Sequence, residues 1–361
     1  MTTKKLPFFS APLRTSLLRA LGAALLFPVL FTACTEDTEE VIAPQQEALP
    51  SIVELAPAPD KFVTLTTDDV AELEKKKGIN RATTAPGPDR GRYNITLKYI
   101  VPVTPEQEQV FEEAAARWER IIIKDLPSFT GTLPSAFTGF PPAVDGTVDD
   151  IVIEVALAPI DGPGGILGQA GPRYVRLPEY LSLSGVMFFD VADLGLLDEL
   201  GLFEEVIVHE MGHVLGIGTL WNSGGRTLRE FNAEGLPYFD GKQANVFWNA
   251  EGGTYELPIE DQFGPGTQFS HWKEGTLNNE LMTGFLNRGE NPLSRITAGS
   301  VRDLGYGAAM VGETYDLPDG AMGVPINGDP ASMDEAENDG EGIHIAAREI
   351  TLLPIGGVEI K

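Results

Sequence analysis

One ten-residue stretch, residues 209–218 with the sequence HEMGHVLGIG, constrains this chain more than any other. Residues four apart on a helix lie on the same face, so His209 and His213 can direct two imidazoles at one metal ion. Glu210 projects from the neighbouring face, where a carboxylate can serve as a general base toward water. The preceding residues 202–208 are largely apolar, which predicts a buried helix in which three polar side chains need a function.

The five-residue pattern HExxH also occurs by chance, and its alternative reading is a core helix whose histidines bond to backbone carbonyls. The sequence weakens that alternative. Only four histidines occur in the chain, and two of them fall in this motif. Gly216 follows at the spacing found in metzincins and can adopt the left-handed conformation that ends a helix. A third histidine, His271, follows downstream.

The third metal ligand has to come from elsewhere in the sequence. A catalytic zinc takes three protein ligands and keeps one position open for water. Thr219 occupies the position where the usual metzincin pattern places its third histidine, and threonine is not a suitable ligand. His271, which lies 58 residues after His213 (271 − 213) in the context FSHW, is the best candidate. Glu230 or Glu234 is the alternative, but a glutamate ligand leaves the contexts HW and ELMTG without a function.

The combination of HExxHxxG, a long insertion, HW at 271–272 and ELMTG at 280–284 resembles the leishmanolysin family of zinc endopeptidases, in particular its bacterial members. The resemblance covers about residues 94–310. It implies an α+β metzincin-like zinc peptidase domain, with a twisted mixed sheet, a zinc helix and a Met-turn C-terminal subdomain. It also implies one catalytic Zn²⁺ bound by His209, His213 and His271, Glu210 as the catalytic base, and Met282 as the residue of the Met-turn.

Residues 1–33 resemble a bacterial lipoprotein signal peptide. Basic residues precede an apolar run from Leu21 to Phe31, which is too short to span a bilayer comfortably. Small residues then precede Cys34, the single cysteine of the chain, although Phe31 replaces the usual aliphatic residue. We expect Cys34 to be acylated and the protein to be a cell-envelope lipoprotein of the outer membrane or cell surface. Plain secretion with an incidental cysteine is the alternative.

The net charge limits the classes of partner that the protein can bind, and the cysteine count limits its disulfides. The net charge is −27, and removal of residues 1–33 with their four basic groups makes it −31 (−27 − 4). This charge argues against nucleic acid and against binding an anionic membrane by charge, so membrane contact is expected only through the lipid anchor. The expected partners are protein or peptide substrates; the sequence does not indicate an oligomeric state. One cysteine excludes intrachain disulfides, whereas leishmanolysin itself is rich in them.

Composition divides the chain into four parts. Residues 34–92 follow the signal peptide as an acidic, proline-bearing tether or short pro-segment, with a helix predicted at 67–77. Residues 93–317 form the expected catalytic domain. Residues 318–361 are expected to be a linker and a small C-terminal extension containing two short strands. His344 lies in this extension, outside the motif context, and is not expected to be a ligand.

Periodicity predicts several elements within the catalytic domain. A strand is expected at 94–103, a helix from Thr104 onward, and strands at 151–157 and 181–189, whereas 126–149 resembles a loop. Metzincins bind peptides by strand addition at an edge strand. The sequence places that edge near either 166–172 or 185–189.

The residues favour a zinc-dependent endopeptidase that uses metal-activated water and Glu210 as general base. One alternative is a catalytically inactive, surface-anchored binding module that keeps the metzincin fold. Another is a hydrolase of a substrate other than peptide. Glu210 favours an active enzyme, because an inactive homologue would be free to lose it.

Overall fold

The computed structural model describes residues 50–55, 62–77, 91–327 and 342–360. Residues Ala48–Lys361 form one compact unit. The predicted signal peptide and Cys34 lie outside the described residues. In the described part of the chain, no helix has the length and apolar character needed to cross a bilayer.

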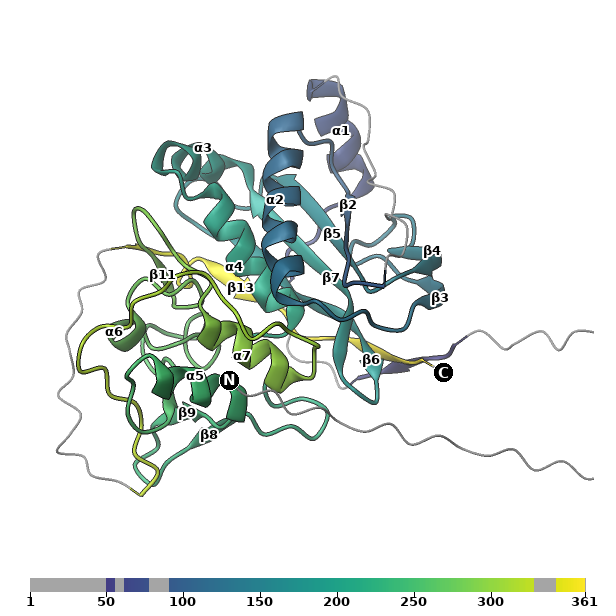
Figure 1. The fold of residues 1–361 in the computed structure, drawn as a ribbon. Coiled ribbons are helices and arrows are strands. Elements are labelled where there is room, and N and C mark those ends of the chain that lie inside the picture. The colour runs from purple at the N-terminus through teal and green to yellow at the C-terminus, as the bar shows by residue number, and fades with distance from the viewer. Residues whose placement is uncertain (1–49, 56–61, 78–90, 328–341, 361) are drawn as a thin grey trace, which may run out of the picture. The chain divides into compact units, whose positions relative to one another are not determined.

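A mixed sheet of seven strands organises the domain, in the order β1-β14-β6-β7-β5-β2 with β13 also paired to β6 (Figure 1). Strands β2, β5 and β7 are parallel, whereas β6 is antiparallel to β7. Strands β13 and β14 run parallel to β6 along its other edge. The strands are β1 (Ile52–Glu54), β2 (Ile95–Tyr99), β5 (Ile151–Ala158), β6 (Gly168–Leu177), β7 (Leu181–Asp190), β13 (Glu349–Thr351) and β14 (Gly356–Glu359).

Alternating side chains of the central strands build a separate core on each face of the sheet. On β7, Met187 and Phe189 belong to the large core cluster, whereas Val186 and Phe188 belong to a second cluster. This alternation follows from the two-residue period of a strand. Both faces of β7 are therefore covered, which explains why the sequence from Leu181 to Phe189 is mainly apolar on both faces.

Helix α2 (Pro105–Ile121) and helix α4 (Phe203–Leu215) pack side by side on the face of the large core cluster. Thr104 and Gln107 form the reciprocal capping box that starts α2, with Pro105 at the first position. The helix α1 (Thr67–Lys77) lies on the other face, where Val70 packs within the second core cluster. The helix α3 (Val191–Leu200) follows β7 directly.

The second half of the domain consists mainly of loops and short elements, as expected for the C-terminal subdomain. Helices α5 and α7 pack against each other, and short strands form the pairs β8–β9, β9–β10 and β11–β12. Its elements are β8 (Arg229–Phe231), β9 (Pro237–Phe239), α5 (Lys242–Ala250), β10 (Leu257–Pro258), α6 (Glu274–Leu277), β11 (Phe285–Leu286), α7 (Arg295–Leu304) and β12 (Ile343–His344). With the mixed sheet, this confirms the predicted α+β fold.

Two regions differ from the sequence-based expectation. The segment 126–149, expected to be a loop, contains a hairpin of β3 (Phe129–Leu133) and β4 (Val144–Val148). The strands were not predicted because the segment is rich in glycine and threonine and resembles a loop. In the structure, the Thr130 and Thr147 hydroxyls form a hydrogen bond across the hairpin, a pairing typical of neighbouring strands. The C-terminal strands do not form a unit of their own, because β12 pairs with β11 and both β13 and β14 pair with β6.

Candidate metal and catalytic site

Three histidines converge in the interior between the sheet and the C-terminal subdomain. The Nε2 atoms of His209 and His213, both on α4, lie 3.0 Å apart. The Nε2 atom of His271, in the loop before α6, lies 3.1 Å from that of His209 and 3.0 Å from that of His213. All three side chains are completely buried. The structure thus brings together the three residues that the sequence analysis selected as ligands.

Each imidazole is oriented by a backbone carbonyl at its other nitrogen. His209 Nδ1 lies 2.7 Å from the carbonyl oxygen of Leu281, and His213 Nδ1 lies 2.9 Å from that of Ile217. His271 Nδ1 lies 3.0 Å from the carbonyl oxygen of Thr267. A carbonyl oxygen can only accept, so each Nδ1 carries the proton and each Nε2 keeps a lone pair toward the centre. This is the tautomer that a metal ligand requires.

A fourth side chain, Glu349 on β13, reaches the same centre. One carboxylate oxygen lies 2.9 Å from His271 Nε2 and 3.4 Å from His213 Nε2, and the other lies 3.4 Å from His209 Nε2. Sequence reasoning missed Glu349 because it stands 136 residues after His213 (349 − 213) and no motif surrounds it. The only signal there is an acidic residue directly before the strand expected from Ile350 onward.

The four residues fit a zinc ion. Zinc–nitrogen bonds of about 2.0–2.1 Å place the ligand atoms of a tetrahedral site about 3.3 Å apart. The corresponding separations here run from 2.9 to 3.4 Å. Imidazole nitrogen and carboxylate oxygen are both ordinary zinc donors, and the Nδ1 contacts provide the outer hydrogen bonds that such ligands need. The four residues are therefore suited to hold Zn²⁺, the expected cofactor.

Glu210 lies next to this cluster with neither carboxylate oxygen hydrogen-bonded to a donor among the described residues. Burial raises the pKa of Glu210 well above its ordinary value, and the negative charge of Glu349 raises it further. Burial likewise lowers the pKa of His209 to about 4, despite the opposing effect of Glu349. For Glu349, burial opposes ionisation, but the surrounding histidines outweigh it and hold its pKa well below the usual range. A bound dication would favour both carboxylates in their charged form.

Helix α4 ends where the sequence predicts. Gly216 adopts φ 118°, and its N–H donates to the carbonyls of Gly212 and His213. The N–H of Ile217 also donates to Gly212, which closes the helix with a left-handed turn. Thr219 contributes no ligand atom to the cluster in the described structure. Its hydroxyl donates to the carbonyl of His213 at 2.7 Å. The turn therefore holds the second ligand in place from its C-terminal side.

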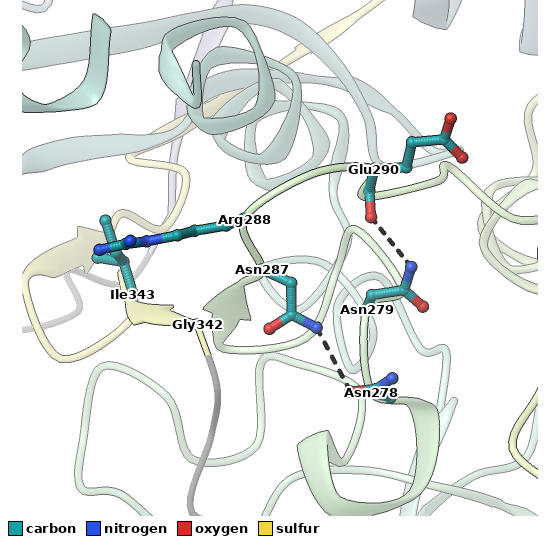
Figure 2. Close-up of a pocket in the computed structure, with 7 residues that line it drawn as sticks. All are labelled: Asn278, Asn279, Asn287, Arg288, Glu290, Gly342 and Ile343. Atoms are coloured by element: carbon teal, nitrogen blue, oxygen red, sulfur yellow. Dashed lines mark hydrogen bonds between the residues drawn. The ribbon is translucent and has the colours of Figure 1, made fainter. Parts of the chain in front are cut away.

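A separate pocket of about 700 Å³ lies beside β11 and β12 and does not include the histidine cluster (Figure 2). Within it, Asn287 donates to Asn278 at 3.3 Å, and Asn279 donates to the carbonyl of Glu290 at 3.0 Å. The pocket is lined by Asn278, Asn279, Asn287, Arg288, Glu290, Gly342 and Ile343.

Met282 lies beneath the ligand helix. A methyl group added at Gly212, between the two histidines of α4, would lie 2.7 Å from the Met282 sulfur. The glycine in HExxH therefore permits the close packing of Met282 against the helix. Trp272, next to His271, stacks on Trp221 with ring centroids 5.0 Å apart and donates its ring N–H to Thr297 at 2.8 Å. These contacts explain why HW and ELMTG accompany the histidines.

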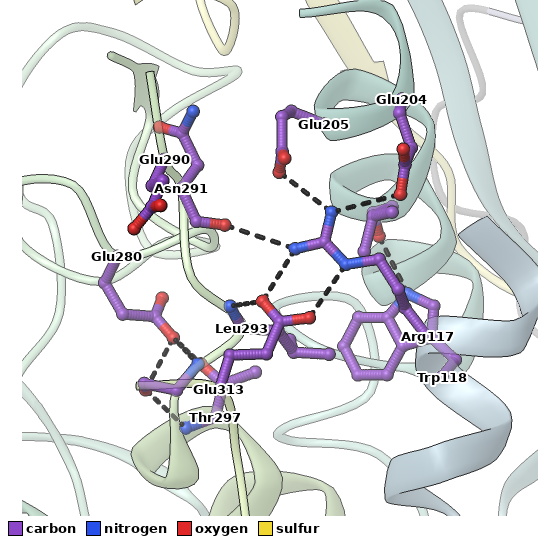
Figure 3. A network of polar contacts seen from close by, with 12 residues as sticks. Arg117, Trp118, Glu204, Glu205, Glu280, Glu290, Asn291, Leu293, Thr297 and Glu313 are labelled. Carbon is purple, nitrogen blue, oxygen red and sulfur yellow. Dashed lines mark hydrogen bonds and ion pairs between the residues drawn. The ribbon is translucent and has the colours of Figure 1, made fainter. Parts of the chain in front are cut away.

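Two buried charged groups organise the surroundings of the site: Glu280 within the C-terminal subdomain, and Arg117 between α2, α4 and the subdomain (Figure 3). Glu280 accepts hydrogen bonds from the Met282 amide at 2.7 Å and from the hydroxyls of Ser294 and Thr297 at 2.7 and 2.6 Å. Arg117 on α2 pairs with Glu205 at the start of α4 and with Glu313 beyond α7, at 3.0 and 2.8 Å. Trp118 donates its ring N–H to the carbonyl of Val208 at 2.9 Å.

Other residues weighed from the sequence lie elsewhere. Glu230 and Glu234 are not part of the histidine cluster in the described structure, and Glu234 is exposed. His344 stacks on Phe285 with ring centroids 4.1 Å apart and is outside the cluster, as expected. Tyr306 closes the core, because its hydroxyl donates to the carbonyl of Leu215 at 3.0 Å.

Comparison with known proteins agrees with the arrangement of histidines and glutamates in the site, because it also finds a metallopeptidase family. The family model described as "Leishmanolysin" matches residues 141–315, which include the histidine motif, His271 and Met282. These residues are similar to the leishmanolysin family. A leishmanolysin homolog from Crithidia fasciculata is 23% identical over 262 residues, which cover 68% of this chain and 35% of the relative. The chain thus spans about a third of the length of this curated relative.

Proposed function

We propose that this protein is a zinc-dependent endopeptidase that hydrolyses peptide bonds of extracellular proteins. The observation that carries the proposal is the convergence of three buried Nε2 atoms, 3.0–3.1 Å apart, beside a glutamate without hydrogen-bond donors. His209, His213 and His271 are the proposed metal ligands, and Glu210 is the proposed catalytic base. The similarity of residues 141–315 to a peptidase family supports the same reading.

Each residue has a distinct part in the proposed mechanism. Zinc held by the three histidines would lower the pKa of a water molecule and polarise the carbonyl of the scissile peptide bond. Glu210 accepts a proton from the attacking water and passes it to the leaving amine. The raised pKa of Glu210 favours the first step, because a carboxylate with a higher pKa is a stronger base toward water. Met282 and the carbonyls at Nδ1 keep the ligands in position.

The test of this function is the substitution Glu210→Gln. We expect peptide cleavage to fall by two orders of magnitude or more, because an amide cannot accept the proton from water. Zinc content and circular dichroism should match the natural protein. The exposed Glu234→Gln serves as a matched control and should cleave normally. Full activity in Glu210→Gln would refute the mechanism, whereas binding of proteins without any cleavage would favour the inactive binding module.

We also propose that the protein is exported and anchored to a membrane through acylated Cys34. The support is in the sequence: a basic start, a short apolar run and small residues before the single cysteine. Several acyl chains anchor a protein stably where one does so only marginally. Replacement Cys34→Ala should release the protein into the soluble fraction or stop its processing. Mass spectrometry of the natural N-terminal peptide decides, since an unmodified peptide beginning after Cys34 would indicate plain secretion.

A further inference from the structure

The metal site is closed by the chain itself. A catalytic zinc keeps one coordination position open, whereas a zinc with four protein ligands has no place for water or substrate. Glu349 supplies a fourth ligand atom 2.9 Å from His271 Nε2. It also lies beside Glu210, where the attacking water would have to be held. The three histidines, Glu210 and the Glu349 side chain are all inaccessible to solvent.

Glu349 belongs to a segment that crosses the site from one side to the other. In Figure 1 this segment is yellow, and β13 lies next to α4. It begins with β12, which pairs with β11 just after the Met-turn, and the amide of Ala346 then donates to the carbonyl of Gly284 at 3.1 Å. Beyond the cluster, the amide of Leu352 donates to the carbonyl of Ala170 on β6 at 2.7 Å. The segment therefore contacts both sides of the site: the loop after the Met-turn on one side and β6 on the other.

Strand β13 fills the edge at which a peptide substrate would bind. Without the C-terminal strands β13 and β14, β6 would be the outermost strand beyond β7, so the free edge next to α4 would lie in the 166–172 region and not at 185–189. Glu349, Ile350 and Thr351 pair with Gly168, Gln169 and Ala170. An edge strand offers unpaired N–H and C=O groups that bind an extended peptide. Here those groups are taken by the protein's own C-terminal segment.

The surrounding surface is shaped for this segment. A methyl group at Gly266 would lie 2.3 Å from the carbonyl oxygen of Ala346, so only glycine permits the approach. Gly171 on β6 likewise meets the carbonyl oxygen of Leu352, 2.2 Å from the position of an added methyl group. Arg348 forms an ion pair with Asp193 at 2.6 Å and donates to the carbonyl of Gly165 at 3.0 Å. These contacts hold the residue next to Glu349 on the domain.

We propose that residues 343–351 occupy the substrate groove as an intramolecular inhibitor, with Glu349 as a displaceable fourth ligand of the metal. The proposal rests on the peptidase function proposed above. In this state the enzyme is latent, and a peptide gains access only when the segment leaves β6 and the Glu349 carboxylate leaves the metal. Residues 349–351 of this occupant are extended along β6 and carry one carboxylate at the ligand position, so a zinc-binding peptide analogue competes for the same place.

The experiment uses the zinc-loaded full chain and a peptide hydroxamate, which binds a metal and an edge strand without being cleaved. Calorimetry measures its affinity for the natural protein, for Glu349→Ala and for the control Glu359→Ala, which removes an exposed glutamate of β14, outside the occluding segment. We expect Glu349→Ala to bind the hydroxamate at least tenfold more tightly, with zinc content unchanged. Glu359→Ala should match the natural protein. Equal affinity for all three proteins overturns the proposal.

A second measurement uses the natural sequence, so it decides the matter even if Glu349→Ala loses zinc or fails to fold. Hydrogen exchange follows two amides that depend on the segment: Leu167, which donates to the carbonyl of Arg348, and Leu352, which donates to that of Ala170. Saturating hydroxamate should accelerate exchange at Leu352 at least tenfold as the segment is displaced. Hydroxamate binding with unchanged protection of both amides overturns the proposal.

Peptide cleavage separates this proposal from the proposed function. Faster cleavage by Glu349→Ala than by the natural protein supports both. Tighter hydroxamate binding by Glu349→Ala without any cleavage supports the occluding segment and refutes the peptidase. Rapid cleavage by the natural protein, with no gain in rate or affinity in Glu349→Ala, supports the peptidase and refutes the occluding segment.

Discussion

At the scale of single residues, burial governs the acidic side chains around the metal cluster. Glu210, Glu274 and Glu349 are each at most 4% exposed, yet their environments push their pKa values in different directions. Glu349 faces three imidazoles, which lower its pKa, whereas Glu210 faces a carboxylate and a desolvated interior, which raise its pKa. Similar burial therefore has opposite outcomes for the pKa values of Glu349 and Glu210, because the charged and polar groups that face each carboxyl differ.

Glu274 offers a test of this electrostatic picture away from the catalytic base. Burial raises its pKa from 4.5 to about 7. Between these values the unfolded carboxyl has already ionised while the folded one still holds its proton, so its contribution to stability is lost as pH rises. The substitution Glu274→Gln stays neutral. We expect its stability relative to the natural protein to increase between pH 5 and pH 8 by on the order of 2 kcal/mol.

Denaturant unfolding at several pH values, with both proteins in the same metal state, measures this difference. Glu290→Gln removes an exposed carboxylate and should show no such trend. A stability difference between Glu274→Gln and the natural protein that stays constant with pH would contradict the shifted pKa.

The sequence predicted the identity of several side chains in the cluster and missed one. His209, Glu210 and His213 are four residues or fewer apart, so helical geometry alone brings them to one place. His271 depended on the resemblance of its context to a family. Glu349 carries no local pattern, because its place is determined by the pairing of β13 with β6. Nor could the carbonyls at the three Nδ1 atoms be predicted, since backbone groups carry no sequence signal.

At the scale of elements, the Met-turn depends on one buried carboxylate. Glu280 accepts from the hydroxyl of Thr297 (Figure 3), from the hydroxyl of Ser294 and from the Met282 amide, which connects the turn to the start of α7. The next residue, Leu281, holds His209 through its carbonyl. The position of a metal ligand therefore depends on an acidic side chain that does not touch the metal site.

In Glu280→Gln one acceptor oxygen becomes an NH₂ group, which cannot accept from the donors around it. We expect a loss of about 1–3 kcal/mol in stability, because a buried donor is left without a partner. We also expect zinc affinity to fall by roughly 10–100-fold, as for other groups that position ligands. Denaturant unfolding and competition with a zinc-binding dye measure the two effects. The exposed Glu290→Gln should change neither stability nor zinc affinity. Unchanged zinc affinity in Glu280→Gln would show that the Met-turn keeps its position without the Glu280 carboxylate.

Helix α2 and strand β6 show which elements a sequence can reveal. The start of α2 was predictable because Thr104, Pro105 and Gln107 satisfy the first turn locally. Strand β6 was not, since Gly171 and Pro172 interrupt its pattern and a bulge follows between Pro172 and Tyr174. Its extended form depends on neighbours from distant parts of the chain, β7 on one edge and β13 and β14 on the other.

At the scale of the whole molecule, the metal centre joins parts of the chain that are far apart in sequence. His209 and His213 come from α4, His271 from the C-terminal subdomain, and Glu349 from a strand added to the central sheet. The single cysteine leaves no intrachain disulfide to join these parts. We therefore expect bound zinc to carry a large share of the stability that joins these parts of the chain.

Removal of zinc by a chelator should lower the melting temperature by roughly 5–15 °C. A ligand at a thousand times its dissociation constant stabilises by about 4 kcal/mol, and each kcal/mol shifts a domain of this size by a few degrees. Calorimetry with and without chelator measures the shift. Glu210→Gln, which keeps all four ligands, should lose as much as the natural protein. His209→Ala, which lacks a ligand, should melt low and respond little to chelator; an equal response there would place the stabilising metal outside this cluster.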